Sequence, residues 1–523
     1  MVLAIVVAGG VVLDLLAPVA TSRPPKVAPI LPVESGAWYC AVGDTAKGNT
    51  LTIVGAVHPS ATDSAALEID TYASGERRRA GEVEVASGSL HVHPVAGTVG
   101  EVGVTAQWWR APTTVTRLWS RGASGEPNGL VTGPCESEPA STWYLPGVTT
   151  VGGAQARIVV SNPFDTDAAF SVTLLTQDGE ETPELLKNVG VTSHSVRVID
   201  LNAHAPERAD LGAVVAVRAG RVVAEAWQSL NPAIGGIEGV SLAKLTAQTA
   251  SSWTVPWFPG GEDAWLWVAN VGDHPATLEL TVHTPNGGVP PEGLEEVIVS
   301  PGTIRRFDLR GVLPAGLRSG AVTVGSADGG AIVVSGATQI RSARPERTGM
   351  SIQLGARTPD ASWMVMSGSI RGRGETLHLV NPTAEPTVAD VRVVAPNIDL
   401  EPGPLQGVSV PAGALVDLDL ADAVGDIGPH AVFVTARSGQ LISGLHGSAR
   451  EGRLALVAQP GVPSSFWSGG QALPPVEFAP GLPQRLGTRL GPSTSPQPTP
   501  PSLPGFPDVE GDGRLGETRE FGE

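Results

Sequence analysis

Short apolar runs, each followed by a turn-forming residue, recur along most of this sequence. The runs 158–160, 266–268 and 377–380 consist mainly of Val, Ile and Leu, and each is followed within two residues by Asn162, Asn270 or Asn381. Proline comes directly after Asn162 and Asn381. Because proline cannot donate to a β ladder and asparagine favours turns, each run predicts a strand that ends in a turn. With 65 glycines and 46 prolines besides, we expect an all-β chain without long helices.

A pattern of about a hundred residues occurs four times. A tryptophan preceded by a small residue recurs at intervals of 105, 110 and 110 residues, as Trp38, Trp143, Trp253 and Trp363. In the last three copies an aspartate lies nine residues after a valine, at Asp200, Asp308 and Asp419. Such constant spacing indicates tandem copies of one module. The short strands and frequent turns predict that each module is a β-sandwich of the immunoglobulin-like kind.

Within these modules, two apolar runs on either side of a glycine predict a hairpin. Residues 212–215 and 222–223 flank Gly220, and similar pairs of runs flank Gly329 and Gly439. Glycine supplies the positive φ that a tight hairpin turn requires.

The ends of the chain differ in composition from the modules. The first 20 residues are apolar except for Asp14, and this stretch predicts a signal peptide or a transmembrane anchor, with a buried first strand or helix as the alternative. The last 50 or so residues are rich in proline and lack apolar periodicity, which is typical of disorder. The predicted organisation is an export segment (1–21), a linker (22–35), a divergent first module (36–138), three further modules (139–250, 251–360 and 361–468) and a disordered tail (469–523).

Charge and cysteine content narrow the function. The net charge of -18 repels phosphate backbones, so we expect no nucleic-acid partner. Cys40 and Cys135 are the two cysteines of the sequence, and an even, low count in an exported protein predicts one disulfide, which here would tie the two ends of the first module. The alternative is a pair of buried free thiols.

Three groups of residues could carry chemistry, and each has a simpler interpretation. His91 and His93 alternate as metal ligands on a strand would, with His58 as a third member, yet they fall where the other copies have an ordinary strand end. Asp200, Asp308 and Asp419 lie in separate modules, which favours turn or cap roles over acid–base catalysis. Asn162, Asp165 and Asp167 have a spacing that suits calcium, but the other copies do not repeat it. We therefore expect no metal, no cofactor and no enzymatic activity.

Four further tryptophans are candidates for contact with a glycan. Trp108 and Trp109 are adjacent, so one of them should face outward if they lie on a strand, and Trp265 with Trp267 adds a second pair. An exposed indole ring can stack on a sugar. The repeated tryptophans, by contrast, are predicted to be core anchors.

The segments 143–147 (Trp-Tyr-Leu-Pro-Gly), 156–163 and Asp200-Leu201 resemble an actinobacterial family of secreted or membrane-anchored proteins that is known only as a domain of unknown function. The resemblance covers roughly residues 141–467 and implies an exported β-repeat protein without assigned catalytic residues. We expect a non-catalytic cell-envelope protein on the outer side of the membrane, held there by its N-terminal segment and acting as a structural or interaction scaffold. Its partners would be cell-wall glycan or other envelope proteins. The alternative is an array of glycan-binding modules that use exposed tryptophans.

Overall fold

The structure is a computed structural model that describes residues 35–466 except 47, 97–99, 123–126, 261, 295–296, 311, 315, 344–345, 368–372, 426 and 450–455. These residues lie in one compact unit of the chain. Their strands form eight sheets with antiparallel pairing, so the all-β prediction is confirmed. The predicted export segment and tail fall outside the described residues. Within the described part of the chain, no helix has both the length and the apolar character needed to cross a bilayer.

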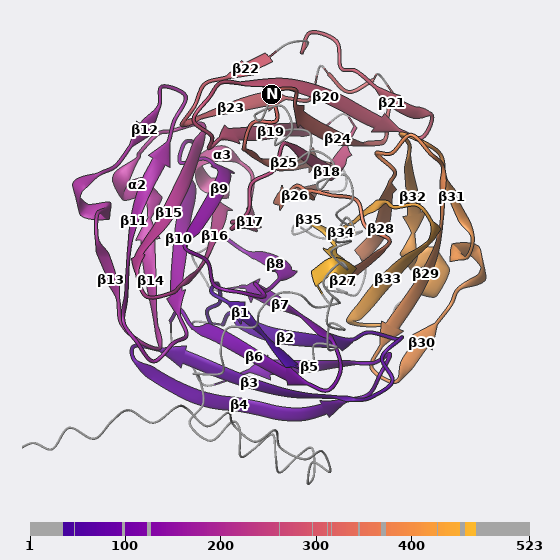
Figure 1. The fold of residues 1–523 in the computed structure, drawn as a ribbon, viewed down its shortest axis with the longest axis horizontal. Helices are drawn as coiled ribbons and strands as arrows, with labels where there is room; N and C mark the ends of the chain where they lie inside the picture. The colour runs from indigo at the N-terminus through magenta and orange to yellow at the C-terminus, as the bar shows by residue number, and fades with distance from the viewer. Residues whose placement is uncertain are drawn as a thin grey trace, which may run out of the picture. The chain divides into compact units, whose positions relative to one another are not determined.

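The strands follow one another in four groups, and each group supplies two sheets (Figure 1). The first group contains β1 (Ser35–Cys40), β2 (Thr50–Val57), β3 (Ala65–Ala73), β4 (Glu76–Val85), β5 (Leu90–Val95), β6 (Gly103–Trp109), β7 (Thr113–Arg121) and β8 (Gly129–Pro134). The second contains β9 (Thr142–Val148), β10 (Ala154–Asn162), β11 (Ala168–Leu175), β12 (Glu180–Glu181), β13 (Val189–Val191), β14 (Ser195–Asp200), α2 (Leu201–His204), β15 (Leu211–Ala219), β16 (Val223–Leu230), α3 (Pro232–Gly235) and β17 (Gly239–Ala243).

The third group contains β18 (Ser252–Pro259), β19 (Asp263–Asn270), β20 (Ala276–Thr284), β21 (Gly287–Val289), β22 (Val297–Val299), β23 (Thr303–Asp308), β24 (Ser319–Ser326), β25 (Ile332–Ala343) and β26 (Glu346–Leu354). The fourth contains β27 (Ser362–Ser367), β28 (Arg373–Val380), β29 (Thr387–Ala395), β30 (Ile398–Leu400), β31 (Val408–Val410), β32 (Leu415–Asp419), α4 (Leu420–Val424), β33 (His430–Ser438), β34 (Ile442–Ala449), β35 (Leu456–Pro460) and β36 (Val462–Pro463).

Strand order is the same in each group. In one sheet, the order from the strand that carries the repeated tryptophan is β1-β6-β3-β4, β9-β15-β11-β12, β18-β24-β20-β21 or β27-β33-β29-β30. In the fourth group β36 adds to the other side of β27. The other sheets have the orders β5-β2-β7-β8, β14-β10-β16-β17, β23-β19-β25-β26 and β32-β28-β34-β35. The sequence repeat therefore corresponds to a repeat of topology.

The predicted hairpins are wrong, because the strands on either side of each glycine belong to different sheets. β15 pairs with β11 and β9, whereas β16 pairs with β10 and β17. Gly220, at φ 71°, thus turns the chain from one sheet to the other. Gly329 and Gly439 have similar φ values of 72° and 75°. A turn signal shows that the chain reverses, but it does not show which sheet receives the next strand.

Each repeated tryptophan anchors a core in the same way. The side chains of Trp38, Trp143, Trp253 and Trp363 are all buried. Their indole Nε1 atoms donate to the carbonyls of Thr113 (2.6 Å), Val222 (3.2 Å), Ile332 (2.8 Å) and Leu441 (2.7 Å). Burial of the large ring is favourable because its one polar atom keeps a partner. The predicted core role is confirmed.

The asparagine that ends a strand fastens three segments together. Asn270 is fully buried, and its Nδ2 donates to His274 O (2.8 Å) and Val299 O (2.9 Å), while its Oδ1 accepts from Gly272 N. Asn162 and Asn381 make the same three contacts at the same sequence separations. The asparagine therefore has a structural role, since it holds the end of its strand against two other segments of the same group.

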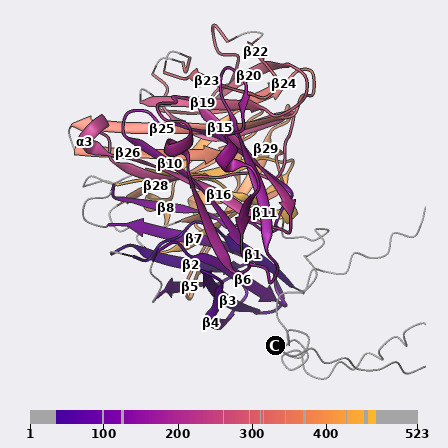
Figure 2. The ribbon, with the colours of Figure 1, turned by 90° about the vertical axis from the view of Figure 1, so that its left-hand side faces the viewer.

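The four groups form a closed ring within this unit. The last strands of the groups, β8, β17, β26 and β35, lie at the centre of Figure 1 with the other strands around them. β8 contacts β17, β17 contacts β26, β26 contacts β35, and β35 contacts β8 again. Ser241 Oγ accepts from Ile352 N at 2.7 Å, and Ser351 Oγ accepts from Ala458 N at 2.9 Å, so these inner strands are hydrogen-bonded between groups. Figure 2 shows β8 and β26 from the side.

Each junction between neighbouring groups is held by a different kind of contact. Arg117 on β7 forms an ion pair with Glu225 on β16, and both side chains are fully buried. Trp267 on β19 donates to Asp210 Oδ1 of the second group at 2.8 Å. Between the third and fourth groups, Trp257 stacks on His446 with ring centroids 4.1 Å apart. The ring closes where His58 of the first group meets Phe433 of the fourth, edge to face at 5.1 Å.

Candidate functional site

The four tryptophans proposed to contact a glycan are buried. Trp108, Trp109, Trp265 and Trp267 expose 6%, 5%, 4% and 0% of their surface. The Trp108 ring occupies the space over Gly36, the glycine beside it on β1. Trp267 packs over Gly147 of the second group, and the Arg306 guanidinium covers Trp265 at 4.2 Å. The expectation that Trp108 or Trp109 faces outward is wrong, because both rings are buried. Alternation along a strand does not show what covers either face of the sheet.

Cys40 and Cys135 form the predicted disulfide. Their Cα atoms lie 4.7 Å apart, and the bond closes a separation of 95 residues. Backbone bonds between Tyr39 and Glu136, 2.7 and 2.8 Å long, flank it and join the two ends of the first group.

The other candidates are occupied by protein contacts. Asp200 and Asp419 cap α2 and α4 by accepting from Asn202 N and Asp422 N, and Asp308 accepts from Arg310 N. Asp165 pairs with His194 at 3.3 Å, and Asp167 accepts from Ser193 N, so these two carboxylates do not meet at a common point with Asn162. His91 and His93 lie next to each other, with ring centroids 5.9 Å apart, while His58 packs on Phe433. No cluster of three or more metal-ligating side chains occurs among the residues that the structure describes.

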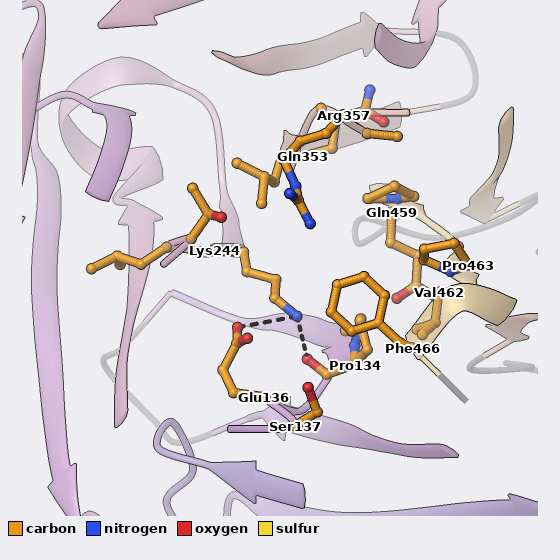
Figure 3. Close-up of a pocket in the computed structure, with 18 of the residues that line it drawn as sticks. Pro134, Glu136, Ser137, Lys244, Gln353, Arg357, Gln459, Val462, Pro463 and Phe466 are labelled. Carbon is orange, nitrogen blue, oxygen red and sulfur yellow. Dashed lines mark hydrogen bonds and ion pairs between the residues drawn. The ribbon is translucent and has the colours of Figure 1, made fainter. Parts of the chain in front are cut away.

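A cavity of about 180 Å³ lies where the four groups converge. Its walls include the four repeated tryptophans and the end of the last strand of each group with the residues that follow it. Figure 3 shows its polar lining: Lys244, Glu136 and Ser137 with Arg357, Gln353 and Gln459, together with Phe466. Each group supplies part of the wall, so the complete ring is needed to form this space.

One side of the cavity carries a paired cation. Lys244 Nζ donates to Pro134 O at 3.0 Å and lies 3.2 Å from Glu136 Oε1 (Figure 3). Burial raises the pKa of Glu136, and the Lys244 ammonium acts in the opposite direction. Burial also raises the pKa of Glu138, another carboxylate in the wall. The Lys244–Glu136 pair joins the first and second groups.

The other side carries an unpaired cation. Arg357 is partly buried, and among the described residues it has neither a hydrogen-bond partner nor an ion-pair partner. Burial lowers the pKa of its guanidinium group. Gln353 and Gln459 donate to Trp257 O and Met366 O, which leaves their buried Oε1 atoms without a partner in the described structure.

A second polar cluster lies between the third and fourth groups. His378 Nδ1 is 2.7 Å from Asp417 Oδ1, and His378 Nε2 is 2.9 Å from His446 Nδ1. Ser319 bonds to Asp417 and not to either imidazole, so no histidine is placed to activate this hydroxyl. Trp257 stacks on His446 and closes the cluster. These residues join the two groups.

Sequence reasoning missed the cavity, because its equivalent lining positions become apparent only from the strand pairing. The pairings Tyr39–Glu136, Tyr144–Thr246, Thr254–Ala356 and Met364–Val462 define equivalent positions in the four groups. Arg357 then corresponds to Ser137, Ala247 and Pro463, and Lys244 to Pro134, Leu354 and Pro460. Arg357 and Lys244 are thus charged where the other copies have neutral residues.

The comparisons with known proteins give a family. Residues 91–326 and 315–455 match the family described as Family of unknown function (DUF5719). No curated protein matches this sequence. Among solved structures, the crystal structure of Streptomyces avermitilis alpha-L-rhamnosidase complexed with L-rhamnose is similar at 10% identity and a TM-score of 0.13. The match covers 75% of this chain and 55% of that chain, and a TM-score this low carries no argument.

Proposed function

Because the chain belongs to the DUF5719 family of unknown function, we propose a role from its own geometry: it is a non-catalytic scaffold of four immunoglobulin-like modules closed into a ring. The observation that carries this proposal is the closure itself. Contacts run from β8 through β17 and β26 to β35 and back to β8. A closed ring fixes the positions of all its outer loops, which suits a protein that presents several binding surfaces at once.

The proposed location is outside the cytoplasm, on the cell envelope. The disulfide between Cys40 and Cys135 supports it, because such bonds persist in oxidising compartments. The apolar N-terminal residues would anchor or export the chain. The proposal includes an actinobacterial source and, as partners, cell-wall glycan or other envelope proteins.

The absence of catalysis is also proposed. The polar clusters in the described residues bind other protein groups: Asp417 holds Ser319 and His378, and Glu136 holds Lys244. In neither cluster does a serine hydroxyl contact an imidazole, the usual general base for a serine nucleophile.

A pull-down of the full chain tests the scaffold role. The immobilised protein is exposed separately to purified cell-wall glycan and to solubilised envelope proteins, with free sugar as competitor in the first case. We expect retention of envelope proteins that is insensitive to free sugar. Retention of glycan that free sugar competes away would replace the scaffold role with a lectin-like one, and retention of neither would contradict both.

A further inference from the structure

The cavity at the centre of the ring has features that a purely structural junction does not need. Equivalent positions in the other three groups are filled by Ser137, Ala247 and Pro463, which complete the wall without charge. Arg357 occupies the fourth position. A neutral side chain is therefore sufficient to build this part of the wall.

Arg357 lines the cavity without a protein partner among the residues described. Its side chain is partly exposed, so the guanidinium keeps some contact with solvent in the cavity. Lys244, by contrast, has Glu136 and Pro134 O as partners. A bound anion would give Arg357 the partner that Lys244 already has.

We propose that this cavity binds a small organic carboxylate, with Arg357 as its counter-ion. Guanidinium pairs with carboxylate through two parallel hydrogen bonds, which fixes the orientation of the ligand.

Size and polarity restrict the ligand further. A volume of about 180 Å³ exceeds the roughly 30 Å³ that one water molecule occupies in the liquid, so the cavity has room for several non-hydrogen atoms but not for a polymer. Trp38, Trp143, Trp253, Trp363 and Phe466 give it largely apolar walls. Glu136 and Glu138 disfavour a ligand with several negative charges. A monocarboxylate with an apolar body fits these conditions best.

Calorimetric titration of the full chain tests the proposal. The probes are propionate, lactate and benzoate, each compared with its uncharged primary amide. We expect at least one carboxylate to bind while its amide does not, and Arg357→Gln to weaken that binding about 10- to 100-fold, as loss of a charged hydrogen bond does. Arg197→Gln, which changes an exposed arginine on β14, should leave binding unchanged. No binding by any of the three carboxylates, or equal binding by Arg357→Gln, would overturn the proposal.

A stability measurement gives an independent readout. The carboxylate that binds should raise the unfolding temperature of the wild type and leave that of Arg357→Gln unchanged, because a ligand stabilises only the protein that binds it. An equal rise in both proteins would contradict the proposal. The two measurements together separate a ligand site from a water-filled junction.

Discussion

The buried ion pair between Arg117 and Glu225 shows how a single residue can hold two parts of the ring together. Glu225 accepts from the guanidinium of Arg117 and from the backbone N–H groups of Ala41 (2.7 Å) and Val42 (2.9 Å). Three of its partners therefore come from the first group, while Glu225 itself belongs to the second. Removing one member of such a pair leaves a charge buried without compensation.

We expect Glu225→Gln to lower the free energy of unfolding by about 3–5 kcal/mol, because the Arg117 charge then remains buried and unpaired. Denaturant unfolding followed by tryptophan fluorescence measures this change. Glu181→Gln, which breaks the exposed pair with Arg208, is the matched control and should cost no more than about 1 kcal/mol. Equal effects of the two substitutions would show that burial does not determine the value of the Arg117–Glu225 pair.

At this scale the sequence was a good guide wherever a residue's role is local. The strand-ending asparagines and the capping aspartates act within a few residues or within one group, and their spacing revealed them. Trp267 was misread because its partners, Gly147 and Asp210, come from another group. Alternation along a strand shows which face a side chain lies on, but it does not show what covers that face.

At the scale of elements, the first group differs from the others in two places: it has a disulfide, and it lacks the strand-ending asparagine. The disulfide joins the end of β1 to the residue after β8, and the closed loop spans 95 residues. Asn162, Asn270 and Asn381 pin the corresponding strand ends of the other groups, whereas the first group has His58 at that place.

We expect the double substitution Cys40→Ser, Cys135→Ser to lower the free energy of unfolding by up to about 4 kcal/mol, the entropy of closing such a loop in the unfolded chain. Chemical denaturation with and without a reducing agent measures it. The reducing agent should bring the wild type to the stability of the double variant and leave that variant unchanged. If it alters neither protein, the bond does not contribute to stability.

The partner of each strand could not be predicted from the sequence. Gly220, Gly329 and Gly439 mark real turns, yet each connects two sheets, because the residues of a turn do not determine which sheet receives the next strand. That information is not local. The cavity was missed for a similar reason, since it exists only where the ends of β8, β17, β26 and β35 meet.

At the scale of the whole described unit, the junction between the third and fourth groups makes stability depend on pH through His446. Burial and the neighbouring His378 lower the pKa of His446 to about 3, while Asp417 acts in the opposite direction. Between about pH 6.5 and 3, His446 is therefore protonated in the unfolded chain, where its pKa is about 6.5, but neutral in the folded chain. The contribution of neutral His446 to the free energy of unfolding is complete above about pH 6.5 and decreases as the pH falls from there toward 3.

We expect His446→Gln to flatten this dependence between about pH 6.5 and 4, where one such histidine contributes at most about 1.4 kcal/mol per pH unit. Unfolding free energies measured across that range provide the comparison. His274→Gln changes a histidine on the surface and should leave the slope nearly as it is in the wild type. An unchanged slope for His446→Gln would show that its protonation is not coupled to folding.

Closure of the ring between the first and fourth groups, at His58 and Phe433 and between β8 and β35, has a consequence for cooperativity. An open string of four such groups would have three junctions, and its end groups could unfold with the loss of only one. In a ring every group shares two junctions, so no group is terminal and fraying from an end is suppressed. The unfolding of any one group then removes support from both neighbours. Such a molecule should melt in one concerted step, with equal calorimetric and van't Hoff enthalpies, where a linear array would come apart piece by piece.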